Sequence, residues 1–152
     1  MPNRLKSSRR WGLATAFLLF FADRWLKIAA NAHLLPPRFG FIQFGLFHNY
    51  GATLGIFLND RFFLIMVAVL FVVLLFYVFW RWQQLGVWFW LGWGLLLGGT
   101  LGNLYDRVRS GFVTDMLHVS FYPPIFNLAD VGIRLGLLWM ILAYWWHYRY
   151  KS

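Results

Sequence analysis

The sequence predicts an all-α membrane protein with four transmembrane helices, and with short strands or turns on the outer membrane surface between the first two spans. The chain has 152 residues, of which 61% are hydrophobic and 22% aromatic, whereas only 12% are charged. Soluble domains carry about 25% charged residues, so this composition argues against a soluble or a disordered protein. Four long apolar runs divide the chain, and its length fits one membrane domain, residues 1–152.

The first expected span covers residues 11–30 and is the least regular of the four. A dozen apolar residues are followed by Asp23, Arg24 and Lys27 before the apolar character resumes. A cleavable signal peptide is the alternative, because basic residues precede the run and small residues follow it near Ala30. Three ionisable residues between the apolar centre and that site disfavour cleavage, so we expect an uncleaved span.

The second and third expected spans contain no charged side chain. Residues 62–80 match the roughly 20 apolar residues that a helix needs to cross a bilayer. Residues 85–105 form a second uncharged run, in which Gly94, Gly98 and Gly102 recur every fourth residue. This spacing puts small residues on one helix face, where another helix can pack closely, so we expect these glycines to serve packing.

The fourth expected span covers residues 131–148. It is apolar except for Arg134 near its start and His147 near its end. Long polar side chains at such positions can reach the membrane interface while the helix crosses the bilayer.

The distribution of basic residues predicts the orientation of the chain. Seven basic residues outside the spans lie on one side of the membrane and four on the other, namely Arg4, Lys6, Arg9, Arg10, Arg81, Arg149 and Lys151 against Arg38, Arg61, Arg107 and Arg109. The positive-inside rule then places both termini in the cytoplasm. The net charge of +9 is thereby explained by topology, and we expect no nucleic-acid partner.

The two outer connections, residues 31–61 and 106–130, are the longest segments between spans. The first contains Pro36 and Pro37, and residues 39–47 alternate in part between apolar and polar positions. This pattern favours short strands or turns on the membrane surface and indicates no separate soluble domain.

Acidic residues are scarce enough to be considered one by one. The chain has five Asp, no Glu and no Cys, which excludes disulfides, thiolate nucleophiles and Cys-ligated metals. Asp60 directly precedes the second span and is expected to cap that helix. Asp23, Asp106, Asp115 and Asp130 fall at or near the outer ends of the other spans, so they should share one membrane depth.

Two of these acids have an evident structural interpretation. Asp23 lies four residues before Lys27, and a carboxylate in that position pairs well with a lysine on a helix. Asp106 is adjacent to Arg107, which cannot share its helix face, but either side chain could bond to the backbone or to another span. We therefore expect positioning roles for both acids.

Asp115 and Asp130 differ because no basic residue lies within four positions of either, apart from Arg134. If the fold brings them together, two carboxylates near lipid cannot comfortably both ionise, and they would share one proton. That arrangement is typical of aspartic proteases, in which one carboxylate activates water and the other polarises the scissile carbonyl.

The motifs around the acids carry a family resemblance. Residues 98–107 read GGTLGNLYDR, 113–115 read VTD, 126–130 read FNLAD, 49–52 read NYGA and 23–27 read DRWLK. In order and character these five motifs resemble the bacterial lipoprotein signal peptidase family, signal peptidase II. The resemblance covers essentially the whole chain, including its length and its four-span layout.

The resemblance implies roles for particular residues. Asp115 and Asp130 would be the catalytic dyad of an intramembrane aspartic endopeptidase. The residues that would bind substrate or support the site are Asp23, Lys27, Asn49, Gly51, Asn103, Asp106, Arg107, Asn127 and Ala129.

The resemblance also implies the partners. Substrates would be prolipoproteins whose cysteine already carries diacylglycerol, cleaved just before that cysteine in the bacterial cytoplasmic (inner) membrane, among membrane lipid. No metal or organic cofactor is expected. Globomycin-type inhibitors would occupy the dyad, and a small extracytoplasmic β-rich cradle between spans one and two would hold the substrate.

The chemistry of the supporting residues suits the roles that the resemblance gives them. Asn103 and Asn127 each offer a donor and an acceptor, which suits them to fix a carboxylate or an extended peptide. Asn127 could equally cap the fourth helix, and the two roles can coexist. Gly51 and Ala129 leave room for a peptide to approach.

Some positions depart from the family pattern. A hydroxyl residue usually precedes the lysine of the first motif, where this chain has Leu26. An aromatic residue commonly follows NxGA, where this chain has Thr53 and Leu54. These differences bear on substrate fit.

Other functional classes remain as alternatives. A small proton or cation transporter could use aspartates at the membrane edge, although transporters more often place ionisable groups near the midplane. A presenilin-like protease shares only the Tyr105–Asp106 pair. A zinc protease would need an HExxH motif, which the sequence lacks around its four histidines, His33, His48, His118 and His147.

Overall fold

The computed structural model describes residues 2–51 and 60–150. Its elements in chain order are α1 (Pro2–Asn31), β1 (Arg38–Phe39), β2 (Ile42–Asn49), α2 (Arg61–Arg81), α3 (Val87–Ser110), β3 (Val113–Val119), β4 (Tyr122–Phe126) and α4 (Leu128–Arg149). The prediction of a mainly helical protein with four helices is confirmed. The three positions Ala52, Thr53 and Leu54, which belong to or follow the NxGA motif, lie outside the described residues.

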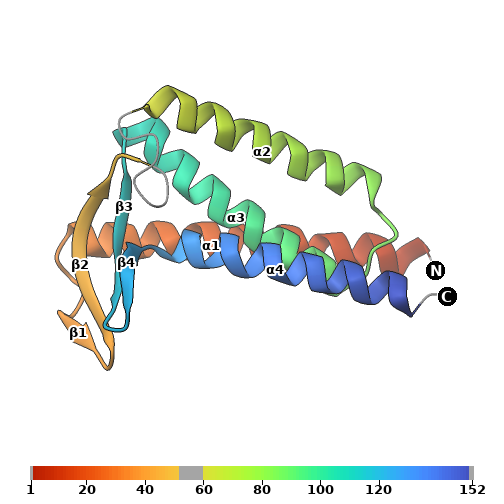
Figure 1. Cartoon of the computed structure of the whole chain (residues 1–152). Helices are drawn as coiled ribbons and strands as arrows, with labels where there is room; N and C mark the ends of the chain where they lie inside the picture. Colours follow the sequence, from red (N-terminus) through yellow and green to blue (C-terminus); the bar gives the residue numbers. More distant parts are fainter. Residues whose placement is uncertain (1, 52–59, 151–152) are drawn as a thin grey trace.

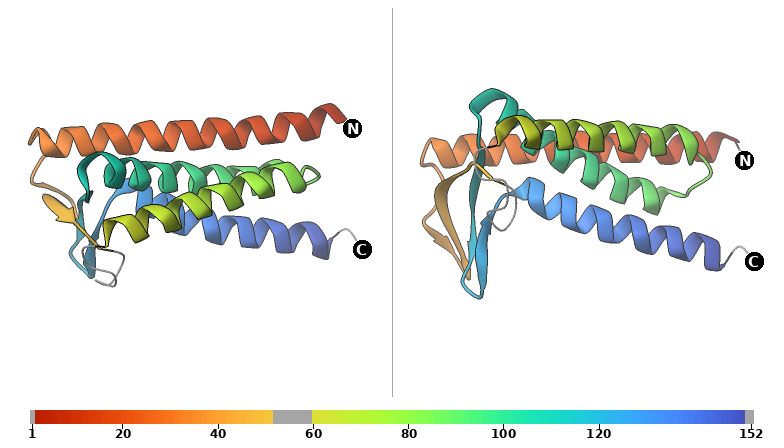
Figure 2. Two further views of the ribbon diagram at one scale, coloured as in Figure 1. Left: turned by 90° about the horizontal axis from the view of Figure 1, so that it is seen from above. Right: turned by 45° about the horizontal axis from the view of Figure 1, so that its top comes forward.

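The four helices run side by side, with both chain ends at one end of the bundle and the sheet at the other (Figures 1 and 2). Helix α3 is central and packs against α1, α4 and α2. The glycines expected on one face of α3 allow α1 to pack closely against it. A Cβ on Gly98 would lie 2.5 Å from the carbonyl oxygen of Ala16, and one on Gly94 would collide with that of Gly12, both on α1.

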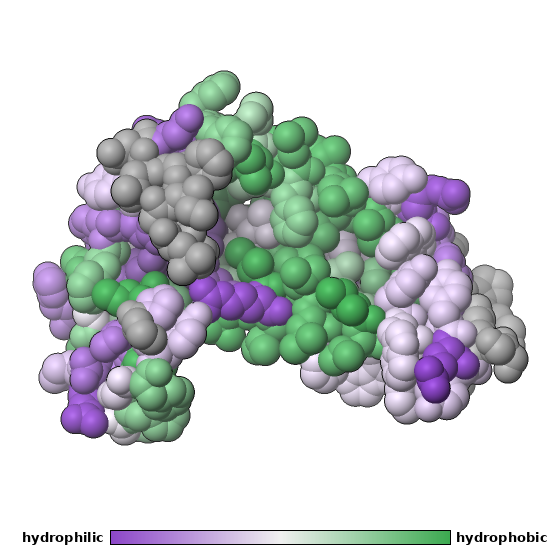
Figure 3. Space-filling view, viewed as in Figure 1, coloured by the Kyte–Doolittle hydropathy of each residue, from purple (hydrophilic) through white to green (hydrophobic). Residues whose placement is uncertain are grey.

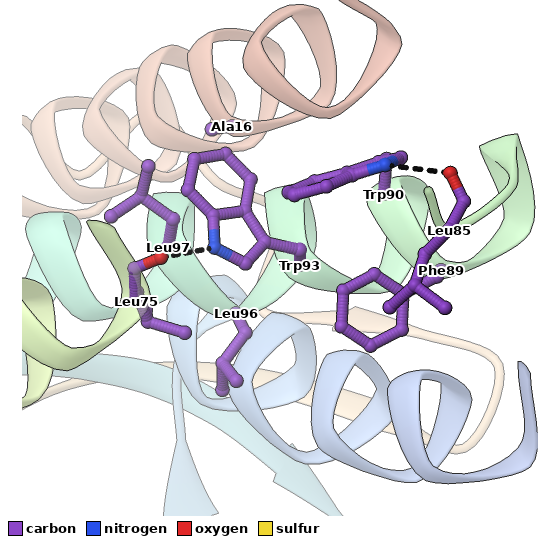
Figure 4. Close-up of a cluster of buried hydrophobic side chains, with 8 residues drawn as sticks. All are labelled: Ala16, Leu75, Leu85, Phe89, Trp90, Trp93, Leu96 and Leu97. Atoms are coloured by element: carbon purple, nitrogen blue, oxygen red, sulfur yellow. Dashed lines mark hydrogen bonds between the residues drawn. The ribbon is translucent and has the colours of Figure 1, made fainter. Parts of the chain in front are cut away.

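The hydrophobic core lies in the half of the bundle that is remote from the sheet, where α3 crosses α1 and α2 (Figure 4). Trp90 and Trp93 of α3 are completely buried. The indole N–H of Trp93 donates to the carbonyl oxygen of Leu75 at 2.8 Å, and that of Trp90 donates to Leu85 at 3.0 Å. Both polar atoms are therefore satisfied inside an apolar cluster.

On the face that Figure 3 shows, the surface of the bundle is apolar over its middle, and hydrophilic residues gather at its two ends. Within the described residues, α2 and α4 are long and apolar enough to cross a membrane. Helix α2 leaves most of its large side chains exposed, including Phe62, Leu70 and Val73. Its N-terminus is capped as predicted, because the Oδ1 atom of Asp60 accepts from the N–H of Phe63 at 2.9 Å.

The sheet is antiparallel in the order β1-β2-β3-β4. The short strands or turns expected within residues 39–47 are present as β1 and β2, but the sequence predicts no strand in the second outer connection, which supplies β3 and β4. Its strand character depends on pairing with β2, from a distant part of the chain. Two prolines, Pro123 and Pro124, also disfavour a strand, and β4 accommodates them because it lies at an edge.

Candidate active site

Four of the five carboxylates gather where the sheet meets the ends of α1, α3 and α4. Asp115 is the third residue of β3, and Asp130 is the third residue of α4. Antiparallel pairing places Asp115 opposite Phe47 of β2. Asp115 is buried and Asp130 half-buried, and the charge of Asp130 acts on Asp115 directly. The fold thus brings together the two acids that had no assured local partner in the sequence.

Asn127 links the two carboxylates. Its Nδ2 donates to Oδ1 of Asp115 at 2.6 Å, and its Oδ1 accepts from the backbone N–H of Asp130 at 2.9 Å. Its own N–H donates to Oδ2 of Asp130 at 3.3 Å, which completes a capping box at the start of α4. The helix cap and the contact with the acids therefore coexist in one fully buried side chain.

Asn49, at the end of β2, holds the other oxygen of Asp115. Its Nδ2 donates to Oδ2 of Asp115 at 2.9 Å, while its Oδ1 accepts from the N–H of Gly51 at 3.0 Å. The carbonyl oxygen of Gly51 in turn accepts from the Arg107 guanidinium at 3.2 Å. Gly51 is buried, so the NxG segment is fixed at the site by its backbone.

Asn103 and Arg107 are one helical turn apart on α3, and both line one groove with Asp130. The Nδ2 of Asn103 donates to Oδ1 of Asp130 at 2.8 Å. Arg107 also donates to the carbonyl oxygen of Asn103 at 3.4 Å.

A cluster of four charges joins α1 to α3 beside this site, with Asp23, Lys27 and Asp106 buried and Arg24 partly exposed. Lys27 contacts Oδ2 of Asp23 at 2.7 Å, the pair predicted from their spacing, and also Oδ2 of Asp106 at 2.9 Å. Arg24 forms a salt bridge with the other oxygen of Asp106. Because two cations face two carboxylates, the buried charges are balanced, as burial requires.

The same cluster fixes the segments that carry Asp115 and Asp130. Oδ1 of Asp23 accepts from the N–H of Ala129 at 2.9 Å, one residue before Asp130. Oδ2 of Asp106 accepts from the N–H of Thr114 at 3.3 Å, one residue before Asp115. The paired carboxylates thereby position the two other acids through the backbone.

The pKa of Asp115 is raised from 3.8 to about 6. Burial is the main cause and the neighbouring charge of Asp130 adds to it, while the hydrogen bonds from Asn49 and Asn127 oppose the shift. An acid in this range can hold a proton and exchange it near neutral pH.

An open groove of about 320 Å³ leads to the site. Apolar side chains from α2 form one wall, and Asn103, Arg107, Asp130 and Arg134 contribute polar groups from α3 and α4. Arg134, one turn after Asp130, donates to the hydroxyl of Tyr122 at 3.1 Å. The polar groups face a mainly apolar wall, an arrangement suited to an extended peptide from an apolar segment.

Three contributors were not predicted from the sequence. Arg24 was noted only as an interruption of the first span, although it is a partner of Asp106. The N–H of Thr114 acts through the backbone. Gly102 was expected to serve packing alone, yet a Cβ there would lie 2.7 Å from Oδ2 of Asp23, so its small size also admits the charge cluster.

The sequence has clear relatives. Residues 15–146 match the family model described as Signal peptidase (SPase) II. A lipoprotein signal peptidase of Dehalococcoides mccartyi is 38% identical over 134 residues, covering 81% of this chain and 81% of the relative. One of Acinetobacter baumannii is 36% identical over 144 residues, covering 86% and 80%.

The fold also has a solved counterpart. The structure of a bacterial membrane enzyme matches with a TM-score of 0.81 at 24% identity, over 93% of this chain and 91% of the other. These relationships favour the peptidase over the transporter. Because the family model spans most of the sequence and relatives above 30% identity cover at least four fifths of it, this chain belongs to the signal peptidase II family of aspartic peptidases.

Proposed function

We propose that this protein removes the signal peptide from diacylglyceryl-modified bacterial prolipoproteins, cleaving just before the lipidated cysteine, with Asp115 and Asp130 as the catalytic dyad. This proposal rests on one observation: a single residue, Asn127, donates hydrogen bonds to both carboxylates beside an open groove. The two relatives named above are lipoprotein signal peptidases, which supports the choice of substrate.

The chemistry follows from one proton shared by the dyad. The ionised carboxylate takes a proton from a water molecule, whose oxygen attacks the carbon of the scissile carbonyl. The protonated carboxylate donates to the carbonyl oxygen, so that charge does not build up there. When the C–N bond breaks, a proton passes to the leaving amine, and the dyad returns to its singly protonated form.

The groove offers the signal peptide a route from the membrane to the dyad. Its α2 wall is formed by Leu64, Val67, Ala68 and Phe71. An apolar signal peptide would lie along this wall, with its scissile bond at Asp130. The amide of Asn103 and the guanidinium of Arg107 offer donors to an extended backbone there, and a globomycin-type inhibitor would compete for the same space.

We also propose that the bundle spans the bacterial cytoplasmic membrane four times, as one domain, with both termini in the cytoplasm. The termini lie together at the end opposite the sheet. Outside the expected spans, six basic residues of the described chain belong to this end, namely Arg4, Lys6, Arg9, Arg10, Arg81 and Arg149, against four near the sheet, Arg38, Arg61, Arg107 and Arg109. The site and the sheet would then lie at the outer face, with β1 to β4 forming the cradle for the substrate.

The decisive test compares three substitutions that make the same chemical change. Asp115→Asn and Asp130→Asn should each abolish cleavage of a diacylglyceryl-modified prolipoprotein in detergent. Asp60→Asn, which alters only the cap of α2, should leave cleavage near the wild-type rate. Near-normal turnover by either of the first two variants would refute the dyad.

A further inference from the structure

Three asparagine amides surround the dyad, and each has a defined direction. Amide oxygen and nitrogen are distinguished by their partners, and a peptide N–H or an ammonium group can only donate. The oxygen of Asn49 faces the N–H of Gly51, and the oxygen of Asn127 faces the N–H of Asp130. The oxygen of Asn103 faces the ammonium of Lys27 at 3.1 Å. Each amide must therefore turn its NH2 group toward a carboxylate.

Lys27 differs from the other two anchors because it is a side chain. Backbone N–H groups hold Asn49 and Asn127, whereas Asn103 is held by an ammonium group from α1, 76 residues away. Lys27 is fully buried, and its two carboxylate contacts, with Asp23 and Asp106, hold it in place.

We propose that Lys27 is a positioning residue for the reaction, because its ammonium fixes the direction of the Asn103 amide and so obliges Oδ1 of Asp130 to remain an acceptor. This inference rests on the proposed function of the dyad. Lys27 does not touch the reacting atoms, although its positive charge also lowers the pKa of Asp115. Its effect on Asp130 passes through one rotatable amide, whose NH2 donates to Asp130 at 2.8 Å.

Loss of the ammonium would remove the constraint on that amide. The Asn103 group could then turn by half a rotation and present its oxygen to Asp130, which disfavours the ionised carboxylate. The other charged groups near Asp130 are Asp115 from β3, Arg107 from α3 and Arg134 from α4. The two arginines donate elsewhere, to Gly51 and to Tyr122. Groove residues from α2 are apolar.

A charge-balanced double variant tests this role. Removing Lys27 alone would leave an excess negative charge in the cluster, so Lys27→Met is combined with Asp23→Asn, and Asp23→Asn alone is the comparison variant. Both variants lose the Asp23–Lys27 ion pair. The double variant also loses the anchor of Asn103, whereas Asp23→Asn keeps it and carries an excess positive charge in the cluster. Melting in detergent, kcat and KM are measured for both.

The double variant should have a kcat roughly 100-fold below that of the comparison variant, as misplacement of a reacting group can cause. Its KM should change little, because Lys27 lies behind Asn103 and makes no contact with the groove. Equal kcat values in the two variants would overturn the proposal.

Adding Asn103→Ala completes the test. If Lys27 acts through Asn103, this substitution lowers kcat in the Asp23→Asn protein but causes little further loss in the double variant. Independent, multiplying losses would overturn the proposal while leaving the dyad intact, since the dyad is tested separately by Asp115→Asn and Asp130→Asn. If the methionine variant does not fold, Lys27→Leu in the same background takes its place, because leucine also lacks a donor for Asn103, and the expected and refuting results are the same.

Discussion

Replacing Asn127 separates the stability of the fold from the positioning of the dyad. Its Oδ1 caps α4 through the N–H of Asp130, and its Nδ2 donates to Asp115 at 2.6 Å. Asn127→Ala removes both bonds. Asn127→Ser keeps a capping oxygen, because serine is as good an N-cap as asparagine, but the shorter side chain lacks the amide nitrogen that contacts Asp115.

The expected magnitudes follow from these bonds. Loss of the cap should lower the free energy of unfolding by about 1 kcal/mol in Asn127→Ala and by little in Asn127→Ser. A hydrogen bond to a charged group contributes about 1.5–3 kcal/mol. If this whole contribution stabilises the transition state, its loss lowers kcat by about 10- to 100-fold in both variants.

The assay pairs thermal unfolding in detergent with cleavage of a diacylglyceryl-modified prolipoprotein. The serine variant is the informative one, since it should melt close to the wild type and yet turn over slowly. A serine variant with wild-type kcat would refute the view that Asn127 positions Asp115. An equal drop in melting temperature for both variants would refute the assignment of the cap.

Three further predictions concern pH, a close contact and the charge cluster. Because burial raises the pKa of Asp115 to about 6, the shared proton is lost as pH rises through this value, and kcat/KM should fall there. The folded state favours the protonated acid, so the stability linked to this group is complete below about pH 4 and is lost as pH rises through about 6; the melting temperature should follow this trend, and Asp115→Asn should abolish it. Gly102→Ala places a Cβ 2.7 Å from Asp23 and should destabilise by about 1–3 kcal/mol, whereas Gly86→Ala, where nothing lies within 4 Å, should cost less than about 1 kcal/mol, because alanine only caps α3 less well than glycine. Asp106→Asn leaves buried cations without their partner and should cost about 3–5 kcal/mol, seen as reduced folded yield together with reduced activity; a well-folded but inactive variant would contradict a purely positioning role.

Much of the helical architecture could be predicted because its signals are local. The uncharged run 62–80 lies within α2, and Asp60 forms the predicted cap. The glycine spacing on α3 correctly indicated close packing against α1. The second half of the sheet could not be predicted, since β3 obtains its strand partner from β2 and its own sequence alternates weakly.

The residues of the candidate site could be predicted from the sequence, but the hydrogen bonds and ion pairs between them could not. All of the acids and amides expected at the site do lie there, but their bonds join distant parts of the chain. Arg24 reaches Asp106 across 82 positions, a pairing that no local spacing indicates. The donor from Thr114 is a backbone N–H, which any residue except proline would supply, so its identity carries no signal.

The donors at each carboxylate separate the structural acids from the proposed catalytic ones. Asp23 and Asp106 contact the cations Lys27 and Arg24, and these ion pairs suit both carboxylates to a fixed structural role. The hydrogen bonds to Asp115 and Asp130 come instead from amide N–H groups, which are neutral and therefore weaker donors than a cation. A direct ammonium contact would oppose protonation of Asp115, whose pKa burial raises to about 6. The ammonium of Lys27 instead contacts the amide of Asn103, so it can set the orientation of that amide without pairing directly with the dyad.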